Sequence, residues 1–420
     1  MQTVIFCSNS NTSAPSTSAS RYITIASSGG NTWESQIAAT RMPVPIAGSF
    51  KYLTGVFQTA IASGSYRVGM CKNGSTTISG PEFTVQNGAQ GGRDTTNSLS
   101  ISAGDDVSIK SEPTGTPTAQ TDGTPVSCVF ESSVANESAI FGFFIATTAP
   151  TYFLPASVTA STSAETNVSA RMPCAGVVDQ LYVRVQTAPG AGGDTLTFTI
   201  NKNGSSTGLT CSIVDGAVTG NDTDTGHAVT FAADDTISLT MTSSGPSPAY
   251  SATGWSVRFV PDIIGESIMA SRIITFTGGA VTAERYGFVA GGSAASTSVE
   301  SQVHAIAPID FVARKLYIKA NVSPGSGNTR TWTLRKGTGG GQSDTALTVT
   351  LGDELEKENT SDSVSVSAND ILTIGTVPTS SPTDSVAIVG SMVAYIAPAA
   401  AGGGAGVVGG GVGRAGGMIG

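Results

Sequence analysis

The chain has 420 residues, of which 52 are glycine and 19 are proline, and only 12% are charged. An average globular protein carries about 25% charged residues, so this surface is built largely from Ser, Thr, Asn and Gly. The net charge of −9 and the pI of about 4.7 leave no basic stripe to follow a phosphate backbone, which excludes nucleic-acid binding. Helix formers are scarce and β-branched residues abundant, which predicts an all-β protein with many turns.

The N-terminal segment, residues 1–19, is rich in Ser, Thr and Asn. It lacks the charged start and the apolar core of a secretory signal. We expect an extended N-terminal arm, in a protein made in the host cytosol that reaches its final location by particle assembly and lysis.

Three similar stretches follow in tandem: residues 20–135, 136–265 and 266–398. Each has a leucine in an apolar strand, then a hairpin lysine, then an aspartate before a late strand. The leucine and lysine are 19, 21 and 20 residues apart (53 to 72, 181 to 202, 316 to 336), and the lysine and aspartate are 34, 33 and 34 apart (72 to 106, 202 to 235, 336 to 370). This agreement predicts three copies of one β domain. The landmarks are Leu53, Lys72 and Asp106; Leu181, Lys202 and Asp235; and Leu316, Lys336 and Asp370.

The strand pattern inside each copy predicts the fold class. Each copy has about eight short strands separated by Gly, Asn, Pro and Asp turns, which is typical of a β-sandwich or jelly roll. In "DTLTFTIN" the alternation puts Leu196, Phe198 and Ile200 on one face and threonines on the other. We therefore expect three tandem jelly-roll domains in a pseudo-threefold cluster, with a linear string of domains as the alternative.

The order of these motifs resembles a known module. The run from "LYVRVQTAPGAGGDTLTFTINKNGSSTGLTCSI" to "VTFAADDTISLTMTSSGPSP" and "WSVRFVP" is similar to a domain of bacteriophage and prophage virion proteins. In layout it also resembles the jelly roll of tumour-necrosis-factor and complement-type heads. The resemblance covers about residues 20–398 and is strongest in the second copy. It implies a virion surface protein, but such heads serve as decorations, fibre tips and adhesins alike.

No stretch of the sequence predicts an active site. The two histidines, His227 and His304, occupy non-equivalent positions in different copies and have no evident acid–base partner. No Ser–His–Asp order, nucleophile elbow or zinc spacing is found. The adjacent Asp105 and Asp106 point to opposite faces of a strand and cannot easily share a proton. We expect no enzyme activity, no cofactor and no metal.

Other residues that could bind a ligand have simpler structural explanations. "NDTDTG" (221–226) faintly resembles a calcium loop but lacks its downstream Glu, and the matching stretches "GRDTTNS" and "KENTSDS" share only the chemistry of polar turns. Trp255 and Trp332 fit strand cores, and with Trp33 they do not form a repeated sugar site, although a single carbohydrate site stays open. The cysteines are odd in number, unevenly spread and without a CxxC pair, so we expect buried thiols. They are Cys7, Cys71, Cys128, Cys174 and Cys211.

The Gly-rich C-terminal tail, residues 399–420, differs from the rest of the chain. It contains Arg414 and is too rich in glycine for a membrane span. Ordering it requires a partner, another virion protein or a copy of this chain, that takes its apolar residues as an assembly site. We expect a non-enzymatic structural protein on a phage-like virion surface: a capsid decoration, head fibre or tail appendage. The alternatives are an adhesin that binds a receptor or host surface glycan, and a self-assembling extracellular filament subunit. The expected assembly residues are Val407, Val408, Val412, Met418 and Ile419.

Overall fold

The computed structural model is built from β-strands, which pair antiparallel except for β11 with β13, and four short 3-10 helices in the part of the chain that it describes. The prediction of an all-β protein is therefore confirmed. Turn residues and alternating apolar positions divide the chain into strands whose apolar faces meet in buried cores. The described residues are 1–7, 14–26, 33–57, 59–120, 124–145, 151–155, 158–160, 164–190, 192–245, 252–274, 282–289, 297–338, 341–383 and 388–398.

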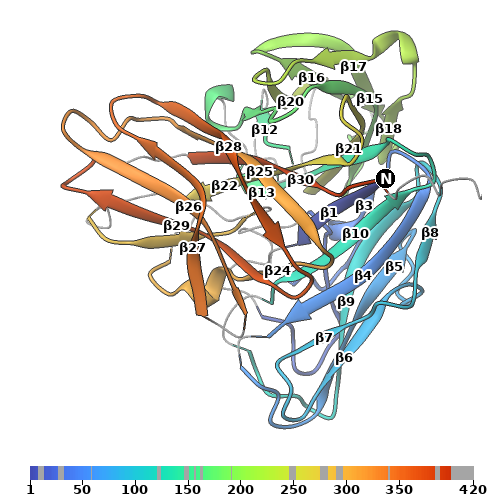
Figure 1. The fold of residues 1–420 in the computed structure, drawn as a ribbon. Coiled ribbons are helices and arrows are strands. Elements are labelled where there is room, and N and C mark those ends of the chain that lie inside the picture. Colours follow the sequence, from blue (N-terminus) through green and yellow to red (C-terminus); the bar gives the residue numbers. More distant parts are fainter. Residues whose placement is uncertain are drawn as a thin grey trace, which may run out of the picture.

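The first unit contains β1 to β10, drawn in blue to cyan in Figure 1. One sheet has the order β1-β10-β4-β7, with β8 also paired to β4; the other has the order β2-β9-β5-β6, with β3 paired to β9. The bounds are β1 Gln2–Cys7, β2 Arg21–Ile23, η1 Ile37–Thr40, β3 Met42–Pro43, β4 Gly48–Val56, β5 Ser65–Lys72, β6 Glu82–Gln86, β7 Gly91–Arg93, β8 Leu99–Ile101, β9 Asp106–Thr114 and β10 Val126–Ser132.

The second unit contains β11 to β21, drawn in green to yellow. Its sheets have the orders β13-β11-β21-β15-β18, with β19 paired to β15, and β12-β20-β16-β17, with β14 paired to β20. The bounds are β11 Ser138–Ile145, β12 Thr151–Phe153, β13 Val158–Ala160, η2 Glu165–Asn167, β14 Ala170–Arg171, β15 Gly176–Val185, β16 Thr195–Lys202, β17 Ser205–Val214, β18 Thr219–Asp222, η3 Thr225–His227, β19 Val229–Phe231, β20 Thr236–Ser244 and β21 Ala252–Pro261.

The third unit contains β22 to β30, drawn in orange to red. Its sheets have the orders β22-β30-β25-β28 and β23-β29-β26-β27, with β24 paired to β29. The bounds are β22 Glu266–Ile274, β23 Arg285–Gly287, η4 Glu300–Val303, β24 Ala305–Ile306, β25 Phe311–Ala320, β26 Thr329–Thr338, β27 Gly341–Leu351, β28 Glu356–Val366, β29 Ile371–Thr379 and β30 Ile388–Tyr395.

Equivalent strands occupy equivalent places in the three units. The three predicted leucines, Leu53, Leu181 and Leu316, are fully buried in β4, β15 and β25. Each follows a residue with positive φ at an irregularity in the strand's pairing with β10, β21 or β30. A bulge adds local twist to a strand, and its repetition directly before Leu53, Leu181 and Leu316 gives the three leucines the same place in their strands. The residues with positive φ are Tyr52 (56°), Gln180 (53°) and Lys315 (58°).

The expected arm over residues 1–19 is wrong where the chain begins. Residues 2–7 form β1, which pairs in register with β10 from Gln2↔Glu131 to Cys7↔Val126. β11 and β22 hold the same place in the second and third units, where they pair with β21 and β30. The first unit therefore starts at β1, because the apolar run "TVIF" supplies a strand that its sheet requires.

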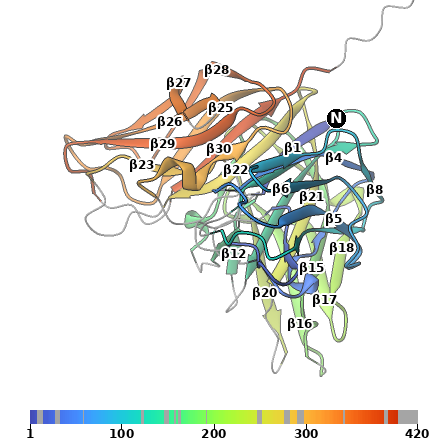
Figure 2. The ribbon, with the colours of Figure 1, turned by 90° about the horizontal axis from the view of Figure 1, so that it is seen from below.

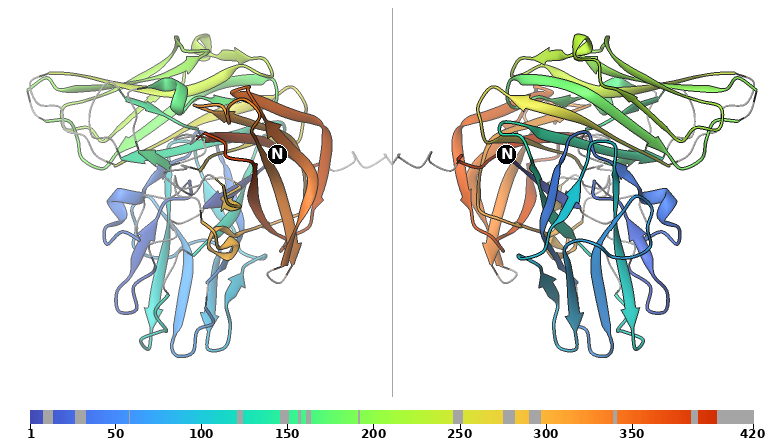
Figure 3. Two further views of the ribbon diagram at one scale, coloured as in Figure 1. Left: turned by 90° about the vertical axis from the view of Figure 1, so that its left-hand side faces the viewer. Right: turned by 90° about the vertical axis from the view of Figure 1, so that its right-hand side faces the viewer.

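The three units lie against one another, as Figures 2 and 3 show from three directions, and they meet through these opening strands. β1, β11 and β22 contact one another. β1 places Ile5 and Cys7 in the core of its own unit, while Val4 and Phe6 on its other face enter the core of the third unit. A strand buried on both faces carries a continuous apolar run, as β1 does.

The other opening strands repeat this exchange. β11 contributes Ile140 to its own core and Phe141 to the core of the first unit. β22 contributes Met269 to its own core and Ile268 to the core of the second unit. The exchange is cyclic, from the first unit into the third, the third into the second and the second into the first. The three strands pack tightly against one another, and the cavity between them measures only about 30 Å³.

Candidate assembly surface

The repeated lysine and aspartate join each hairpin to a neighbouring turn. Lys202 Nζ lies 2.9 Å from Asp235 Oδ2, and Lys336 Nζ lies 3.5 Å from Asp370 Oδ2. Asn203, at φ 51°, donates from Nδ2 to Asp235 Oδ1 at 2.6 Å and holds the turn of the hairpin. Asn tolerates the left-handed conformation that this turn needs. The motif that recurs three times therefore has a structural role.

In the first copy, the aspartate that pairs with the hairpin lysine lies one residue before the predicted one. Lys72 Nζ lies 2.7 Å from Asp105 Oδ2, so Asp105 is the equivalent of Asp235, and the predicted Asp106 is wrong. Asp106 instead accepts from Arg41, with Arg41 Nε 2.7 Å from Asp106 Oδ1. The two adjacent carboxylates thus have different cationic partners, as expected of neighbours on opposite faces of a strand.

The acidic turns of the first two units are held by their own backbone. Asp94 accepts from the amides of Glu82 at 2.9 Å, Thr96 at 2.9 Å and Asn97 at 3.0 Å. Burial opposes ionisation of Asp94, but these hydrogen bonds outweigh burial and lower its pKa. In the second unit Asp222 accepts from Thr210 N at 3.0 Å and from Asp224 N. Among the described residues, no group of three or more His, Cys, Asp or Glu side chains could hold a metal ion.

The histidines lie in separate units and make different contacts. His227 Nδ1 lies 2.9 Å from Asp222 Oδ2, so the expectation that it lacks an acid–base partner is wrong. Asp222 is five residues before His227, and the pair closes the turn around η3. His304 is buried, with Nε2 3.0 Å from Gln342 Oε1, and burial lowers its pKa. The structure does not bring the two histidines together.

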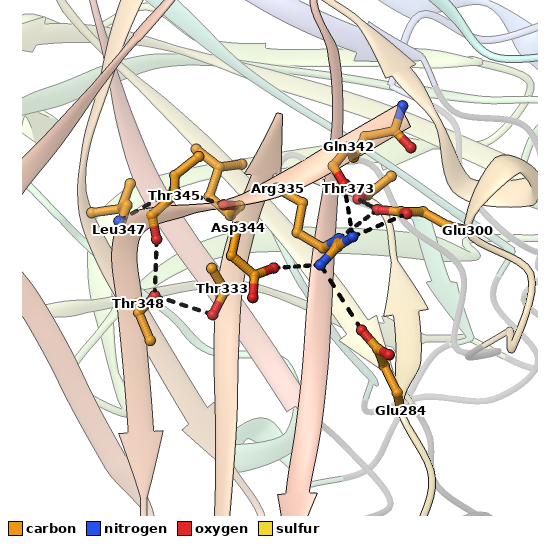
Figure 4. Close-up of polar contacts among 11 residues, drawn as sticks. Glu284, Glu300, Thr333, Arg335, Gln342, Asp344, Thr345, Leu347, Thr348 and Thr373 are labelled. Atoms are coloured by element: carbon orange, nitrogen blue, oxygen red, sulfur yellow. Dashed lines mark hydrogen bonds and ion pairs between the residues drawn. The ribbon is translucent and has the colours of Figure 1, made fainter. Parts of the chain in front are cut away.

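The third unit carries a charged cluster around Arg335, shown in Figure 4. Arg335 Nε donates to Glu300 Oε1 at 2.7 Å, Nη1 pairs with Asp344, and Nη2 donates to Gln342 O at 2.9 Å. Glu300 Oε1 also accepts from Thr373 Oγ1 at 2.6 Å. These contacts tie η4 to β26, β27 and β29.

The second unit has a version of this cluster without an arginine. Glu165 in η2 accepts from Asn201 Nδ2 at 3.1 Å and from Ser238 Oγ at 2.5 Å. Asn201 precedes the hairpin Lys202 as Arg335 precedes Lys336. Because an acid in the same 3-10 helix holds the same two strands in both units, we interpret the cluster as a structural anchor.

The tryptophans and cysteines line the interior. Trp255 and Trp332 are buried in strands, as predicted, and Trp33 is buried too, so none offers an exposed platform for a sugar ring. All five cysteines are free and buried. Burial raises the pKa of Cys71 to about 11 and that of Cys211 to about 12, which makes these thiols small inert hydrophobes. The prediction of buried thiols is confirmed.

One end of the molecule, which we call the linker pole, differs from the rest of the surface. It consists of residues 1–2, 131–136, 262–265 and 396–398. The opening strands begin there and β10, β21 and β30 end there, as their antiparallel registers require. A hollow of about 390 Å³ lies at its centre, between the chain before β1, the two linkers and the chain after β30. Its lining residues include Met1, Glu131, Asn136, Ile264 and Pro398.

The rim of the linker pole is apolar. Val134 is 52% exposed, and Ile263 and Ile264 are each 50% exposed. Val134 and Ile263 hold equivalent places in the first and second units. Val134 lies three residues after Glu131, which pairs with Ser49, and Ile263 lies three residues after Val260, which pairs with Val177. A second hollow of about 330 Å³ shares the wall made by Ile396 and Ala397. Ile264 also lines the central hollow, so exposed apolar area and a hollow meet at the linker pole, which makes it the candidate interaction surface.

The strand ends of the three units differ at this second hollow. After β10, Ser133 N donates to Ala47 O at 3.0 Å, and after β21, Asp262 N donates to Ala175 O at 3.1 Å. At the corresponding place after β30, the hollow separates Ala397 from Asp310 and Phe311. The third unit therefore leaves open a groove that the linkers close in the other two.

The expected assembly residues of the tail, Val407, Val408, Val412, Met418 and Ile419, lie outside the described residues. The last described residue before them is Pro398, on the wall of the central hollow. Sequence reasoning missed the linker pole, although the apolar "II" within the otherwise polar linker "PDIIGES" was a signal for it. Among the described residues, no helix has the length and apolar character needed to cross a bilayer.

Comparison with known proteins adds little. No protein-family model matches the chain, and no curated protein matches its sequence. Among solved structures, the chain is similar to the insecticidal delta-endotoxin Cry8Ea1 from Bacillus thuringiensis at 12% identity and a TM-score of 0.16. The alignment covers 62% of this chain and 53% of the toxin chain, and at this TM-score it carries no argument about fold or function.

Proposed function

We propose that the chain is a non-enzymatic structural protein of a phage-like virion surface, a capsid decoration, head fibre or tail appendage that attaches through the linker pole and the tail. In this proposal each unit is a jelly roll. The third unit supports this, because its eight main strands, numbered in chain order, form sheets of order 1-8-3-6 and 2-7-4-5. Two such four-stranded sheets are the layout of a jelly roll.

The observation that carries the proposal is the cyclic closure of the three units around β1, β11 and β22. One chain thereby makes the kind of head that the resembled families make from three. Both linkers and Pro398 lie at the linker pole, so residues 399–420 start from the end where the units meet. This arrangement suits a head held at one end and displayed at the other.

The test compares the full chain with a chain ending at Pro398 in particles purified from the host. We expect the full chain to co-sediment with particles at a fixed ratio to the major structural protein, measured by quantitative mass spectrometry. The shortened chain should fold normally and keep its melting temperature, because every strand of the described residues lies between Gln2 and Tyr395, but should be absent from particles. Recovery of the full chain only in the soluble fraction would refute the virion assignment.

A further inference from the structure

The linker pole has an unfilled apolar surface directly beside the start of a chain segment that matches it. The two hollows measure about 390 and 330 Å³ and are separated by Ile396 and Ala397. The segment that follows, residues 399–420, combines glycines with a few apolar side chains. We propose that the apolar residues of this segment, Val407, Val408 and Val412, dock on the linker pole of their own chain. This inference is independent of the virion assignment.

The reach of the segment allows such docking. Pro398 lies on the wall of the central hollow, and Val407 is nine residues further on, a span of at most about 30 Å when extended. For a Gly-rich sequence of nine residues, random-coil statistics give an end-to-end distance of roughly 17 Å, so the length of the segment allows the valines to reach the pole. Glycines between them let the backbone approach the surface closely.

The chemistry of the two surfaces is complementary. Val134, Ile263 and Ile264 expose apolar area that valine side chains would cover. The exposed carboxylate of Asp262 lies on the pole and that of Asp310 lies beside it, at the second hollow, whereas Arg414 is the only charged side chain in residues 399–420.

Covalent connection favours the chain's own segment over that of a second copy. A short flexible connection holds a ligand at an effective concentration in the millimolar range. A second copy at micromolar concentration competes at a disadvantage of about a thousandfold. In this arrangement the molecule covers both its apolar pole and its apolar tail.

Trypsin cleavage at Arg414 tests the docking in the intact purified protein. Val412 lies two residues before this site, so docking of Val412 denies the protease the extended segment it needs. Intact-mass spectrometry follows the loss of residues 415–420. We expect the full chain to be cleaved about tenfold more slowly than the free peptide 399–420, as for a segment docked about 90% of the time. The rate should not change on tenfold dilution.

Two variants and one matched control locate the contact. Ile263→Asp combined with Ile264→Asp should bring cleavage to the rate of the free peptide. Val407→Asp combined with Val408→Asp should do the same without altering the folded units. Leu355→Asp is the control, because Leu355 is 49% exposed but lies beside Ala320, at the far end of β25 from the pole, and should leave the rate unchanged.

Three results would overturn the inference. One is cleavage of the full chain at the rate of the free peptide, and another is protection that persists in both variants. The third is protection lost on dilution, which would assign the pole to a second copy. None of these measurements involves a particle, so they fail or succeed separately from the proposed function.

Discussion

Replacing Phe141 with alanine tests whether the three units fold as one. Phe141 belongs to a strand of the second unit, but its side chain packs in the core of the first, 6.2 Å from the ring of Phe130 and 6.4 Å from that of Phe50 between centroids. It is 3% exposed, so the substitution removes a full ring and leaves a cavity. Such changes cost about 3–5 kcal/mol.

The size of the thermal shift reveals the cooperative unit. Unfolding entropy near 60 °C is about 2.1 cal/mol/K per residue, so a loss of about 4 kcal/mol lowers the Tm by roughly 5 °C if all 420 residues unfold together. If the first unit alone, about 135 residues, unfolds separately, the same loss lowers its transition by roughly 14 °C. Because each unit buries its opening strand in a neighbour, we expect one transition and the smaller shift.

Differential scanning calorimetry measures both the number of transitions and their positions. The matched control is Phe198→Ala, which removes a fully buried ring from the core of the second unit alone. We expect both variants to shift the same single transition by similar amounts. A profile in which Phe141→Ala splits off an early transition while Phe198→Ala affects a different one would refute the cooperative arrangement.

Three further predictions concern local contacts. Asp94→Asn should make the free energy of unfolding depend less on pH in the acid range. The pKa of Asp94 is lowered in the folded state, so the ionised carboxylate stabilises the fold above the unfolded-state pKa of about 4, and this stabilisation is lost as the pH falls below that pKa. Urea unfolding between pH 2 and 6 measures the difference. Asn203→Ala should cost about 1–2 kcal/mol in chemical unfolding and more than Asn203→Gly, because only Gly takes the positive φ freely. His227→Ala and His304→Ala should leave assembly on particles intact in co-sedimentation, and any hydrolytic activity that these changes abolish would contradict the structural role assigned to both.

The repeat could be predicted from the sequence because its signals are local. Leu181, Lys202 and Asp235 recur at fixed spacing, and each is fixed by contacts within one unit: burial in a strand for the leucine, an ion pair at a turn for the other two. Asn203-Gly204 marks the hairpin by its preference for positive φ. Patterns of period and turn chemistry can be recognised in the sequence without knowing which residues lie nearby in space.

The errors arose where two residues compete for one role or where a neighbour decides the outcome. Asp105 and Asp106 are both plausible before a strand, and only the position of Lys72 and Arg41 tells them apart. The Ser, Thr and Asn content of residues 1–19 predicts an arm, although the short apolar run at its start forms β1. That run is apolar at consecutive positions, which indicates a strand buried on both faces, but the second face is covered by another unit and cannot be identified from local sequence.

The contacts between units share a geometry but differ in chemistry. Ser127 in β10 and Ser391 in β30 hold equivalent places, opposite Thr54 and Tyr317, just after the bulge of the neighbouring strand. Ser127 Oγ donates to the carbonyl of Ile306 in the third unit, and Ser391 Oγ donates to that of Arg171 in the second at 2.7 Å. Both bonds run from the same unit to the same neighbour as the strand exchange does, from the first unit to the third and from the third to the second. These hydrogen bonds therefore support the same cyclic order as the exchanged strands.

The side chains around these bonds fix which units can be neighbours. Between the second and third units, Arg171 lies 4.4 Å from the ring centroid of Tyr317 and 3.6 Å from Glu358. Between the first and second, Arg184 lies 3.7 Å from Asp106 instead. Exchanging two units would take Arg184 away from Asp106 and leave a partly buried guanidinium without that carboxylate, which is costly, whereas Arg171 would keep its ion pair with Asp234 of its own unit. Because these contacts differ from one junction to the next, three units fused in one chain can present three different outer surfaces, which a trimer of identical chains cannot do.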